Sequence, residues 1–459
     1  MKIYGLPKEE IKKHFDAGDI TVGVFGLGKM GLPLAAMYGQ LGLKVIGVDI
    51  NQKIVNLINN GKSHLINEPG ADTETISKLV NEKRLFATTD GSYAASQADV
   101  MIIIVPTLLD ANKQIILKPV LDVAKSIGEG MKEGSLVLTE CTLPPGTTKN
   151  KILPLIENAS GFKVGRDFGL AHSPERTMSG QVIKNVIESY PKIVGGVEEK
   201  STETAAGFYE SFVKKGVIKV TNATTAEAVK VFEGVYRDVN IGLANELAIL
   251  SQRLGIDVME AISAANSQPY SHIHTPGAGV GGHCIPVYPY FLINLASAVN
   301  QNLAITYTAR KVNEKMPHYM VSLIIESLNE CKKPVNGTTI GILGITYKKG
   351  VKSTYNSPAL VVIPELKRLK ANLMVHDPLY TRAEIEEQLQ VSGESNLEKL
   401  ISEAECLVIL TNHKEYKDEK TIRTIRNSKK LCAVVDGRNI LNKKLFENTK
   451  IIYKAVGVN

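Results

Sequence analysis

The chain has 459 residues, of which 44% are hydrophobic and 22% are charged, a balance typical of folded globular proteins. This composition excludes disorder and fibrous structure for the chain as a whole. The length suggests about three domains and is ample for a large hydrophobic core. The 54 basic and 47 acidic residues give a net charge of +7. These charges form no basic block, and tryptophan is absent, which argues against a nucleic-acid-binding protein.

The five cysteines form no CxxC pair, which predicts free thiols in a reducing compartment. The first 20 residues are charged and lack the apolar core of a signal peptide. No uninterrupted apolar run reaches 18 residues, the length that would suggest a membrane span. We therefore expect a cytoplasmic protein that does not cross a membrane.

The first half of the chain opens with a strand, a helix and a strand, expected at residues 20–25, 30–41 and 44–49. This β–α–β order is typical of a parallel, doubly wound sheet. The strands expected to follow, with helical stretches between most of them, are residues 100–105, 135–140, 169–172 and 192–195.

The middle of the chain is helical in pattern. Residues 224–254 have helical periodicity without proline and stop at Gly255, and a shorter helix is expected at residues 258–266. A Gly/Pro-rich loop at residues 275–289 precedes a second helical pair at residues 291–330.

The last third returns to strand signals. A helix is expected at residues 358–369, and strands are expected at residues 338–343, 373–376, 406–410 and 433–435. We predict an α/β protein with two Rossmann-like doubly wound domains flanking a mainly helical central domain. The expected boundaries are 1–220, 221–330 and 331–459.

A G-x-G-x-x-G motif lies between the first expected strand and helix. Its residues are Gly26, Gly28, Lys29, Met30 and Gly31. In such a loop the first glycine makes a tight turn, the second lets backbone approach a pyrophosphate, and the third lets helix pack on strand. Asp49 ends the second expected strand, where a carboxylate binds a ribose 2′-OH and repels a 2′-phosphate. The motif predicts an NAD site, and a purely structural glycine turn is the alternative.

The segment PGAGVGGHCIP, residues 276–286, carries four glycines within six positions. We interpret them as backbone lying against a ligand, a phosphate or a sugar. Cys284 follows directly, and a cysteine thiolate is a strong nucleophile. On a dehydrogenase it could trap an aldehyde as a thiohemiacetal, which loses a second hydride and becomes a thioester. A buried structural thiol is one alternative. Zinc bound with His272, His274 and His283 is another, but the spacing fits no common structural zinc site, so no metal is expected.

The long helix carries two cations around a glycine. Lys230, Gly234 and Arg237 fall on one face at spacings i, i+4 and i+7. Glycine costs about 1 kcal/mol in a helix interior relative to alanine, so Gly234 predicts the close approach of another group. Two cations beside it would suit an anionic substrate or a developing oxyanion, and a solvated basic face is the alternative.

Taken together, the motifs of this chain resemble those of the nucleotide-sugar 6-dehydrogenases, a family that includes the UDP-glucose, UDP-N-acetylmannosamine and UDP-N-acetylglucosamine dehydrogenases. The resemblance covers nearly the whole chain. Besides the two glycine loops, it rests on VPT (105–107), TECTLPPGTT (139–148), SPER (173–176), PKIVGG (191–196), AEAVKVFEGVYRDVNIGLANELA (226–248) and GITYK (344–348). It implies oxidation of a sugar C6 alcohol to a carboxylate with two NAD in succession.

The resemblance also implies roles for individual residues. Cys284 would be the nucleophile and Glu175 a general acid or base. Lys230 would accept a proton or stabilise an oxyanion, and Thr142 would hold a water. Thr107 and Thr142 would flank the NAD. The contacts implied for the UDP-sugar are Arg176, Thr177, Lys230, Arg237, Gly281, Tyr347 and Lys348.

Four positions depart from the family pattern. Gly234 stands where the family usually has Asn, Tyr288 where it has Asp, and Tyr355 and Tyr270 where it has Arg. The Asn and Asp normally lie beside the catalytic water. The departures therefore imply either a divergent branch in which other groups do these jobs, or reduced turnover.

The GGHCIP and YRDVNI motifs favour an amino sugar as the substrate, UDP-N-acetylmannosamine before UDP-N-acetylglucosamine or UDP-glucose. The rivals are a two-electron hydroxyacid dehydrogenase, which has no need of Cys284, and a catalytically weak paralogue that binds NAD and UDP-sugar. We also expect a homodimer built on the long helix, because its apolar positions exceed what one face can bury.

Overall fold

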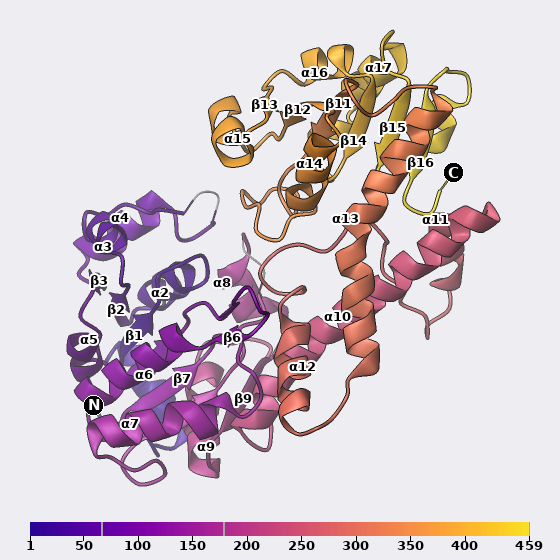
Figure 1. Cartoon of the computed structure of the whole chain (residues 1–459). Coiled ribbons are helices and arrows are strands. Elements are labelled where there is room, and N and C mark those ends of the chain that lie inside the picture. The colour runs from indigo at the N-terminus through magenta and orange to yellow at the C-terminus, as the bar shows by residue number, and fades with distance from the viewer. Residues whose placement is uncertain (66–67, 178–179, 459) are drawn as a thin grey trace. The chain divides into compact units, whose positions relative to one another are not determined.

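The computed structural model describes residues 1–65, 68–177 and 180–458, which form two compact units, Met1–Glu233 and Gly234–Asn459. Each unit contains one large sheet with helices packed against it (Figure 1). No helix within the described parts of the chain combines the length and the hydrophobicity that crossing a membrane requires.

The first unit is built on an eight-stranded sheet in the order β10-β9-β8-β7-β4-β1-β2-β3. All neighbouring strands are parallel except β8 and β9, which pair antiparallel. The strands are β1 (Thr21–Phe25), β2 (Lys44–Val48), β3 (Leu85–Thr88), β4 (Val100–Ile103), β7 (Leu136–Thr139), β8 (Gly169–His172), β9 (Lys192–Gly196) and β10 (Val217–Lys219). A separate hairpin joins β5 (Leu108–Leu109) and β6 (Ile115–Ile116).

Strand β4 shows why the chain forms this sheet. Its four residues are apolar and fully buried, as expected of a strand covered on both faces. Val100 and Ile102 belong to one hydrophobic core, while Met101 and Ile103 belong to a second. The alternation of the side chains therefore divides the core between the two faces of the sheet.

Helices packed on the two faces of this sheet supply the remaining residues of the two cores. Helix α2 is buried from Gly31 to Gly39, as expected of a helix that is apolar all round. The helical segments of this unit are α1 (Lys8–Ala17), α2 (Gly31–Gln40), α3 (Gln52–Asn59), α4 (Thr73–Asn81), α5 (Gly91–Gln97), α6 (Lys118–Gly130), η1 (Thr148–Ile152), α7 (Leu153–Ser160), α8 (Val182–Lys184), η2 (Asn185–Ser189) and α9 (Glu199–Glu210). The 32-residue helix α10 (Ala223–Leu254) follows, and the division between the two units falls within it, after Glu233.

The second unit holds a six-stranded, wholly parallel sheet in the order β13-β12-β11-β14-β15-β16. Its strands are β11 (Thr339–Leu343), β12 (Asn372–His376), β13 (Ser392–Gly393), β14 (Cys406–Ile409), β15 (Ala433–Asp436) and β16 (Ile452–Ala455). Its helical segments besides α10 are α11 (Val258–Ala265), α12 (Tyr288–Ala298), α13 (Ala304–Glu330), α14 (Ala359–Arg368), α15 (Arg382–Leu389), α16 (Leu397–Glu403), η3 (Lys414–Lys417), α17 (Glu419–Asn427) and η4 (Lys443–Phe446).

The fold class predicted from the sequence is confirmed, with two Rossmann-like sheets and a helical region between them in the chain. The predicted positions of the main strands and of the long helix agree with the structure to within a few residues. Helix α1, strand β3 and the edge strands β10, β13 and β16 were not expected. The antiparallel pairing of β9 was not expected either.

Candidate active site

The first glycine loop joins β1 to α2, as its motif predicts. Gly26 has a φ of +106°, and a Cβ there would lie 2.6 Å from the Ile104 carbonyl oxygen. A Cβ at Gly31 would lie 1.7 Å from the Gly26 oxygen, whereas a Cβ at Gly28 would meet nothing within 4 Å. The first and third glycines are therefore required by the fold itself. The second leaves backbone open to a ligand, which fits the approach of a pyrophosphate.

Asp49 lies directly after β2 and beside this loop. Its carboxylate accepts hydrogen bonds from the Leu27 N–H at 3.1 Å and the Asn51 N–H at 2.9 Å. The neighbouring Ile50 is 96% exposed, an unusual position for an apolar side chain that packs on no other part of its unit. The loop and the predicted ribose-binding carboxylate are thus brought together.

Thr107 and Thr142 also meet. The Thr107 hydroxyl donates a hydrogen bond to the Thr142 carbonyl oxygen at 2.6 Å. Thr107 follows β4 and Thr142 follows β7, and these strands are parallel neighbours. The site residues Asp49, Thr107, Thr142 and Glu175 all follow the carboxyl ends of parallel strands of one sheet, which is where open α/β sheets bind ligands.

Glu175 is one corner of a buried charge cluster. The Lys192 ammonium lies 3.1 Å from Oε2 of Glu175 and 3.1 Å from Oε2 of Glu140. The Thr177 backbone N–H donates to Oε1 of Glu175 at 2.6 Å, and the Tyr209 hydroxyl donates to Oε1 of Glu140. Lys192 and Glu140 were not singled out by the sequence analysis.

The charges of this cluster alter the acidity of both carboxyl groups. Burial favours the neutral acid at Glu175, but the Lys192 ammonium and the hydrogen bond from the Thr177 N–H outweigh it, and the pKa of Glu175 is lowered. Burial dominates at Glu140, whose pKa is raised although Lys192 opposes the shift. Glu175 is therefore the carboxylate that stays ionised over the neutral range.

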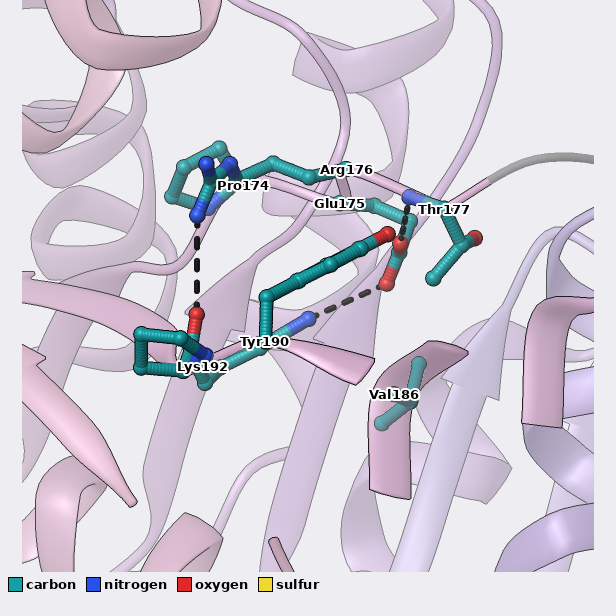
Figure 2. Close-up of a pocket in the computed structure, with 8 residues that line it drawn as sticks. Pro174, Glu175, Arg176, Thr177, Val186, Tyr190 and Lys192 are labelled. Atoms are coloured by element: carbon teal, nitrogen blue, oxygen red, sulfur yellow. Dashed lines mark hydrogen bonds and ion pairs between the residues drawn. The ribbon is translucent and has the colours of Figure 1, made fainter. Parts of the chain in front are cut away.

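Figure 2 shows a small cavity beside Glu175, with Thr177, Arg176 and Tyr190 around it. Its volume is about 10 Å³, roughly the space that one water molecule needs. Among the described residues, the Thr177 hydroxyl, the Tyr190 hydroxyl and Arg176 Nε are buried without a hydrogen-bond partner. The space and its polar lining fit one water molecule or one ligand hydroxyl group.

The predicted cation Arg176 is held from both sides. Its guanidinium forms an ion pair with Glu233 at 2.6 Å and lies 5.2 Å from the centre of the Tyr190 ring. Lys230 is half-buried on α10, one turn before Glu233. Earlier on the same helix, buried Glu227 accepts hydrogen bonds from the Thr148 N–H at 2.7 Å and the Thr148 hydroxyl at 2.6 Å. Helix α10 is thus tied to the segment that follows β7.

The second glycine loop, residues 276–286, is the cysteine loop that carries Cys284. It lies in the second unit, and its glycines pack against the protein itself. A Cβ at Gly277 would lie 3.0 Å from the Arg438 guanidinium, and one at Gly279 would lie 3.1 Å from Pro317. A Cβ at Gly281 or Gly282 would lie 2.7 Å from the Tyr347 side chain. Internal packing accounts for all four glycines. The neighbours that require these glycines cannot be read from the sequence, and the approach of a ligand to this backbone stays a prediction.

Cys284 is exposed and has a free thiol, so it is not the buried structural cysteine of the alternative hypothesis. The preceding His283 stacks face to face on Tyr355, with ring centroids 4.0 Å apart and an angle of 5°. Burial raises the pKa of Tyr347, and the nearby Cys284 raises it further. Lys348 and Arg237 are exposed. Among the residues that the structure describes, no three His, Cys, Asp or Glu side chains gather as metal ligands would.

Two of the departures from the family pattern contact each other. A Cβ at Gly234 would lie 2.3 Å from Cδ2 of Tyr288, and Tyr288 is buried at the start of α12. The close approach predicted from a glycine inside a helix is confirmed, and the approaching group is this tyrosine. The side chains of Tyr288 and of an Asn at position 234 could not both fit in this space. The glycine at position 234 therefore goes together with the tyrosine at position 288.

The predicted site residues fall into two sets. The first unit holds the glycine loop, Asp49, Thr107, Thr142, Glu175, Arg176, Thr177 and Lys230. The second unit holds Arg237, Gly281, Cys284, Tyr347 and Lys348. Within the first set the structure joins Asp49 to the glycine loop and Thr107 to Thr142, and within the second it joins Tyr347 to the cysteine loop.

Comparison with known proteins matches successive parts of the chain to the same family. Three domain models of the UDP-glucose/GDP-mannose dehydrogenase family match: the NAD binding domain at residues 20–213, the central domain at 224–315 and the UDP binding domain at 341–443. A UDP-N-acetyl-D-mannosamine dehydrogenase of Pyrococcus horikoshii is 38% identical over 424 residues, covering 92% of this chain and 96% of its own.

The chain belongs to the UDP-glucose/GDP-mannose dehydrogenase family. It is an NAD-dependent nucleotide-sugar dehydrogenase. The solved structure of UDP-D-ManNAc dehydrogenase from Pyrococcus horikoshii matches it with a TM-score of 0.86 and 36% identity, over 95% of this chain and 99% of that one. A UDP-glucose dehydrogenase from Pyrobaculum islandicum matches with a TM-score of 0.84 and 26% identity, over 96% and 98%. Fold similarity alone therefore does not separate the two sugars.

Proposed function

We propose that this dehydrogenase carries out the four-electron oxidation of UDP-N-acetyl-D-mannosamine at C6, from alcohol to carboxylate, through a covalent intermediate on Cys284. The observation that carries the proposal is the exposed free thiol on a loop fixed by its own packing. A two-electron hydroxyacid dehydrogenase would not need that thiol. When bound, NAD would accept one hydride from C6 in each of two rounds.

The residues of the chain would divide the remaining work. Lys230 would accept the alcohol proton as C6 becomes an aldehyde, and the Cys284 thiolate would add to that aldehyde to give a thiohemiacetal. After the second hydride leaves, the resulting thioester reacts with water, which releases the carboxylate and returns the thiol. Glu175, ionised beside Lys192, would take a proton from that water, and Thr142 would hold the water in place.

For NAD, the open backbone at Gly28 would receive the pyrophosphate and Asp49 the ribose hydroxyls, which favours NAD over NADP. The exposed side chain of Ile50 beside Asp49 supports contact with the adenine ring, and Thr107 would flank the cofactor together with Thr142. The remaining residues of the predicted cofactor loop are Gly26, Lys29, Met30 and Gly31.

For the UDP-sugar, cations and backbone donors would meet the diphosphate. The proposed contacts are Arg176, Thr177, Lys230, Arg237, Gly281, Tyr347 and Lys348. The choice of sugar is supported by the 36% identity to the solved UDP-D-ManNAc dehydrogenase, against 26% to the solved UDP-glucose dehydrogenase. UDP-N-acetylglucosamine is the next candidate, because it differs only in configuration at C2.

Reduced turnover is the second candidate function, and the Tyr288–Gly234 contact favours it. The resemblance implies an amide and a carboxylate near the water at positions 234 and 288, whereas here a tyrosine ring packs on a glycine. We keep catalysis as the main proposal because Glu175 lies in a complete charge cluster and Cys284 is exposed.

We further propose three domains, with boundaries at 1–220, 221–330 and 331–459, close to the ranges of the three family models. A homodimer would form on α10. Tyr236, Leu243, Leu250 and Leu254 are each about half exposed on this helix, and spacings of seven and four place them along one face. A cytoplasmic location stays a prediction.

Counting NADH tests the proposal. Limiting amounts of UDP-N-acetylmannosamine, UDP-N-acetylglucosamine and UDP-glucose are each incubated with excess NAD, and absorbance at the NADH band is followed to completion. We expect two NADH per UDP-N-acetylmannosamine and slower turnover of the others. One NADH per sugar would indicate a two-electron enzyme, and binding without NADH would indicate the weak paralogue.

A further inference from the structure

A buried lysine that no step of the proposed mechanism uses lies behind Glu175. Lys192 is the first residue of β9, and its side chain is 7% exposed. Glu140 follows β7 and Glu175 follows β8, so three neighbouring strands bring one cation and two carboxylates together. An uncompensated buried charge is costly, so the Lys192 ammonium needs a carboxylate partner and an ionised Glu175 needs the ammonium.

The contacts fix the orientation of Glu175 as well as its charge. One carboxylate oxygen accepts from the Lys192 ammonium at 3.1 Å and the other from the Thr177 N–H at 2.6 Å. Figure 2 shows the Glu175 carboxylate between these two donors, beside the small cavity. Glu140 accepts from the same ammonium at 3.1 Å, so Lys192 is bound to both carboxylates.

We propose that Lys192 is a positioning residue for the reaction: tethered by Glu140, it keeps the Glu175 carboxylate charged and in one orientation. The inference rests on the general-base role proposed for Glu175. It goes beyond that role by naming the pair of residues that makes the role possible at neutral pH.

The other groups around the cluster do not replace this cation. Arg176 pairs with Glu233, and burial lowers the pKa of His172 to about 3, so that it is neutral. The hydroxyl groups nearby have raised pKa values and are neutral too. Among the described residues, the titratable groups that face Glu175, Glu140 and Lys192 are Tyr38 on α2, Cys141 after β7, Tyr209 on α9, His172 on β8, Arg176 after β8 and Tyr190 before β9.

The sign of the effect follows from these charges. Without the ammonium, burial favours the protonated form of Glu175. The base would then be lost as the pH falls through the neutral range, whereas in the native cluster it persists to acid pH. Removing Lys192 should therefore shift the acidic limb of the pH–rate profile to higher pH.

The test compares Lys192→Met, which removes the charge, with Lys192→Arg, which keeps it. Lys219→Met on the neighbouring strand β10 is the matched control, because Lys219 is an exposed lysine paired with Glu203. Activity with UDP-N-acetylmannosamine is measured as a function of pH. We expect the acidic limb to rise by about one pH unit or more in Lys192→Met, with NAD affinity unchanged. Lys192→Arg and Lys219→Met should keep the native profile.

A second readout does not depend on turnover. Glutamate labelled with ¹³C at the carboxyl carbon is titrated by NMR, and the Glu175 signal is assigned by its loss in Glu175→Gln. Its midpoint should lie below the usual range in the native protein and above it in Lys192→Met. Should Lys192→Met not fold, Glu140→Gln/Lys192→Met removes the ion pair as a whole and carries the same expectation.

The outcomes separate the two proposals. No UDP-sugar turnover by the native protein would remove the proposed function, while the NMR titration would still report on Lys192. A Glu175 signal that titrates in the methionine variants as it does in the native protein would overturn the inference, even if those variants were slower or less stable.

Discussion

The two glycine loops of this chain look alike in sequence, but their glycines have different surroundings. In the β1–α2 loop, Gly28 has nothing within 4 Å of its missing side chain, and the space beside it is open. In the cysteine loop, Gly281 and Gly282 are covered by Tyr347, and Gly279 by Pro317. The first loop leaves room for a ligand, whereas the second uses its glycines to let other residues hold it in place.

This difference bears on catalysis. A cofactor loop must admit phosphate oxygens to its backbone, so it needs free space at one point. A nucleophile must be presented in one position, because small misplacements of reacting groups are costly. Packing at Gly281 and Gly282, together with the stacking of His283 on Tyr355, fixes the segment before Cys284 while the thiol itself stays exposed.

The largest expected effect comes from the thiol. Cys284→Ser should abolish formation of the acid, by roughly a thousandfold or more, because an alcohol is a far poorer nucleophile than a thiolate. NAD binding, measured by calorimetry, should be unchanged because the cofactor loop is untouched. Full production of the acid by this variant would remove the covalent mechanism.

Adding one methyl group to each loop would separate their roles. Gly282→Ala should lower the free energy of unfolding by roughly 2–4 kcal/mol, from the Tyr347 clash and from a φ of +93°. Gly28→Ala should change stability by less than about 0.5 kcal/mol but weaken NAD binding about tenfold or more. Urea unfolding and NAD titration measure both effects.

Gly337→Ala is the control for backbone strain in that experiment. Gly337 has a φ of +81°, and a Cβ there would have nothing within 4 Å. The stability lost in Gly337→Ala therefore measures the strain of the left-handed backbone alone. The additional loss in Gly282→Ala then measures the contact with Tyr347. Equal losses at the two positions would contradict the packing account of the cysteine loop.

A double-mutant cycle would test the contact between the two departures. Gly234→Ala should destabilise the native protein by about 1–3 kcal/mol, because its Cβ would overlap Tyr288. In a Tyr288→Ala background the same change should stabilise by about 1 kcal/mol, the helix preference for alanine. Chemical denaturation of the four proteins gives the coupling, and additive effects would show that the two side chains act independently.

Glu227 should make the stability of the protein depend on pH. Burial raises the pKa of Glu227 from 4.5 to about 7, despite hydrogen bonds from Thr148 and Gly146. The unfolded chain releases this proton near pH 4.5 and the folded protein only near pH 7. Stability contributed by Glu227 is therefore present below pH 4.5 and is lost as the pH rises toward 7.

Glu227→Gln mimics the protonated acid and should flatten that slope, with a relative gain of about 2 kcal/mol at pH 7 compared with pH 4.5. Urea unfolding at both pH values, with the native protein alongside, measures the change. An identical slope in the two proteins would show that Glu227 ionises normally.

Much of the fold could be predicted because its central strands are continuous apolar runs, such as β4, and because α10 is long and free of proline. Helix α1 could not, since only Ile11 and Phe15 are buried among its charged residues. Edge strands such as β10 are short and partly exposed, so they lack the apolar pattern that marks central strands.

The site residues also differ in how far they could be predicted from the sequence. Local motifs predicted the cofactor loop and Asp49, which lie close together in the sequence. The Lys192–Glu140–Glu175 cluster could not be predicted in this way, because its members come from three strands and meet only through the sheet order. A lysine opening the otherwise apolar, buried strand β9 was the one available signal. The Tyr288–Gly234 contact likewise joins residues far apart in sequence.

Covalent capture of the sugar on Cys284 is the central claim, and mass spectrometry of peptides from acid-quenched enzyme tests it most directly. Enzyme mixed with UDP-N-acetylmannosamine and NAD is quenched within one turnover and digested with protease. The account predicts a thioester-linked sugar adduct on the peptide that contains Cys284, absent when NAD is omitted. Formation of the acid with no adduct on that peptide at any quench time would contradict it.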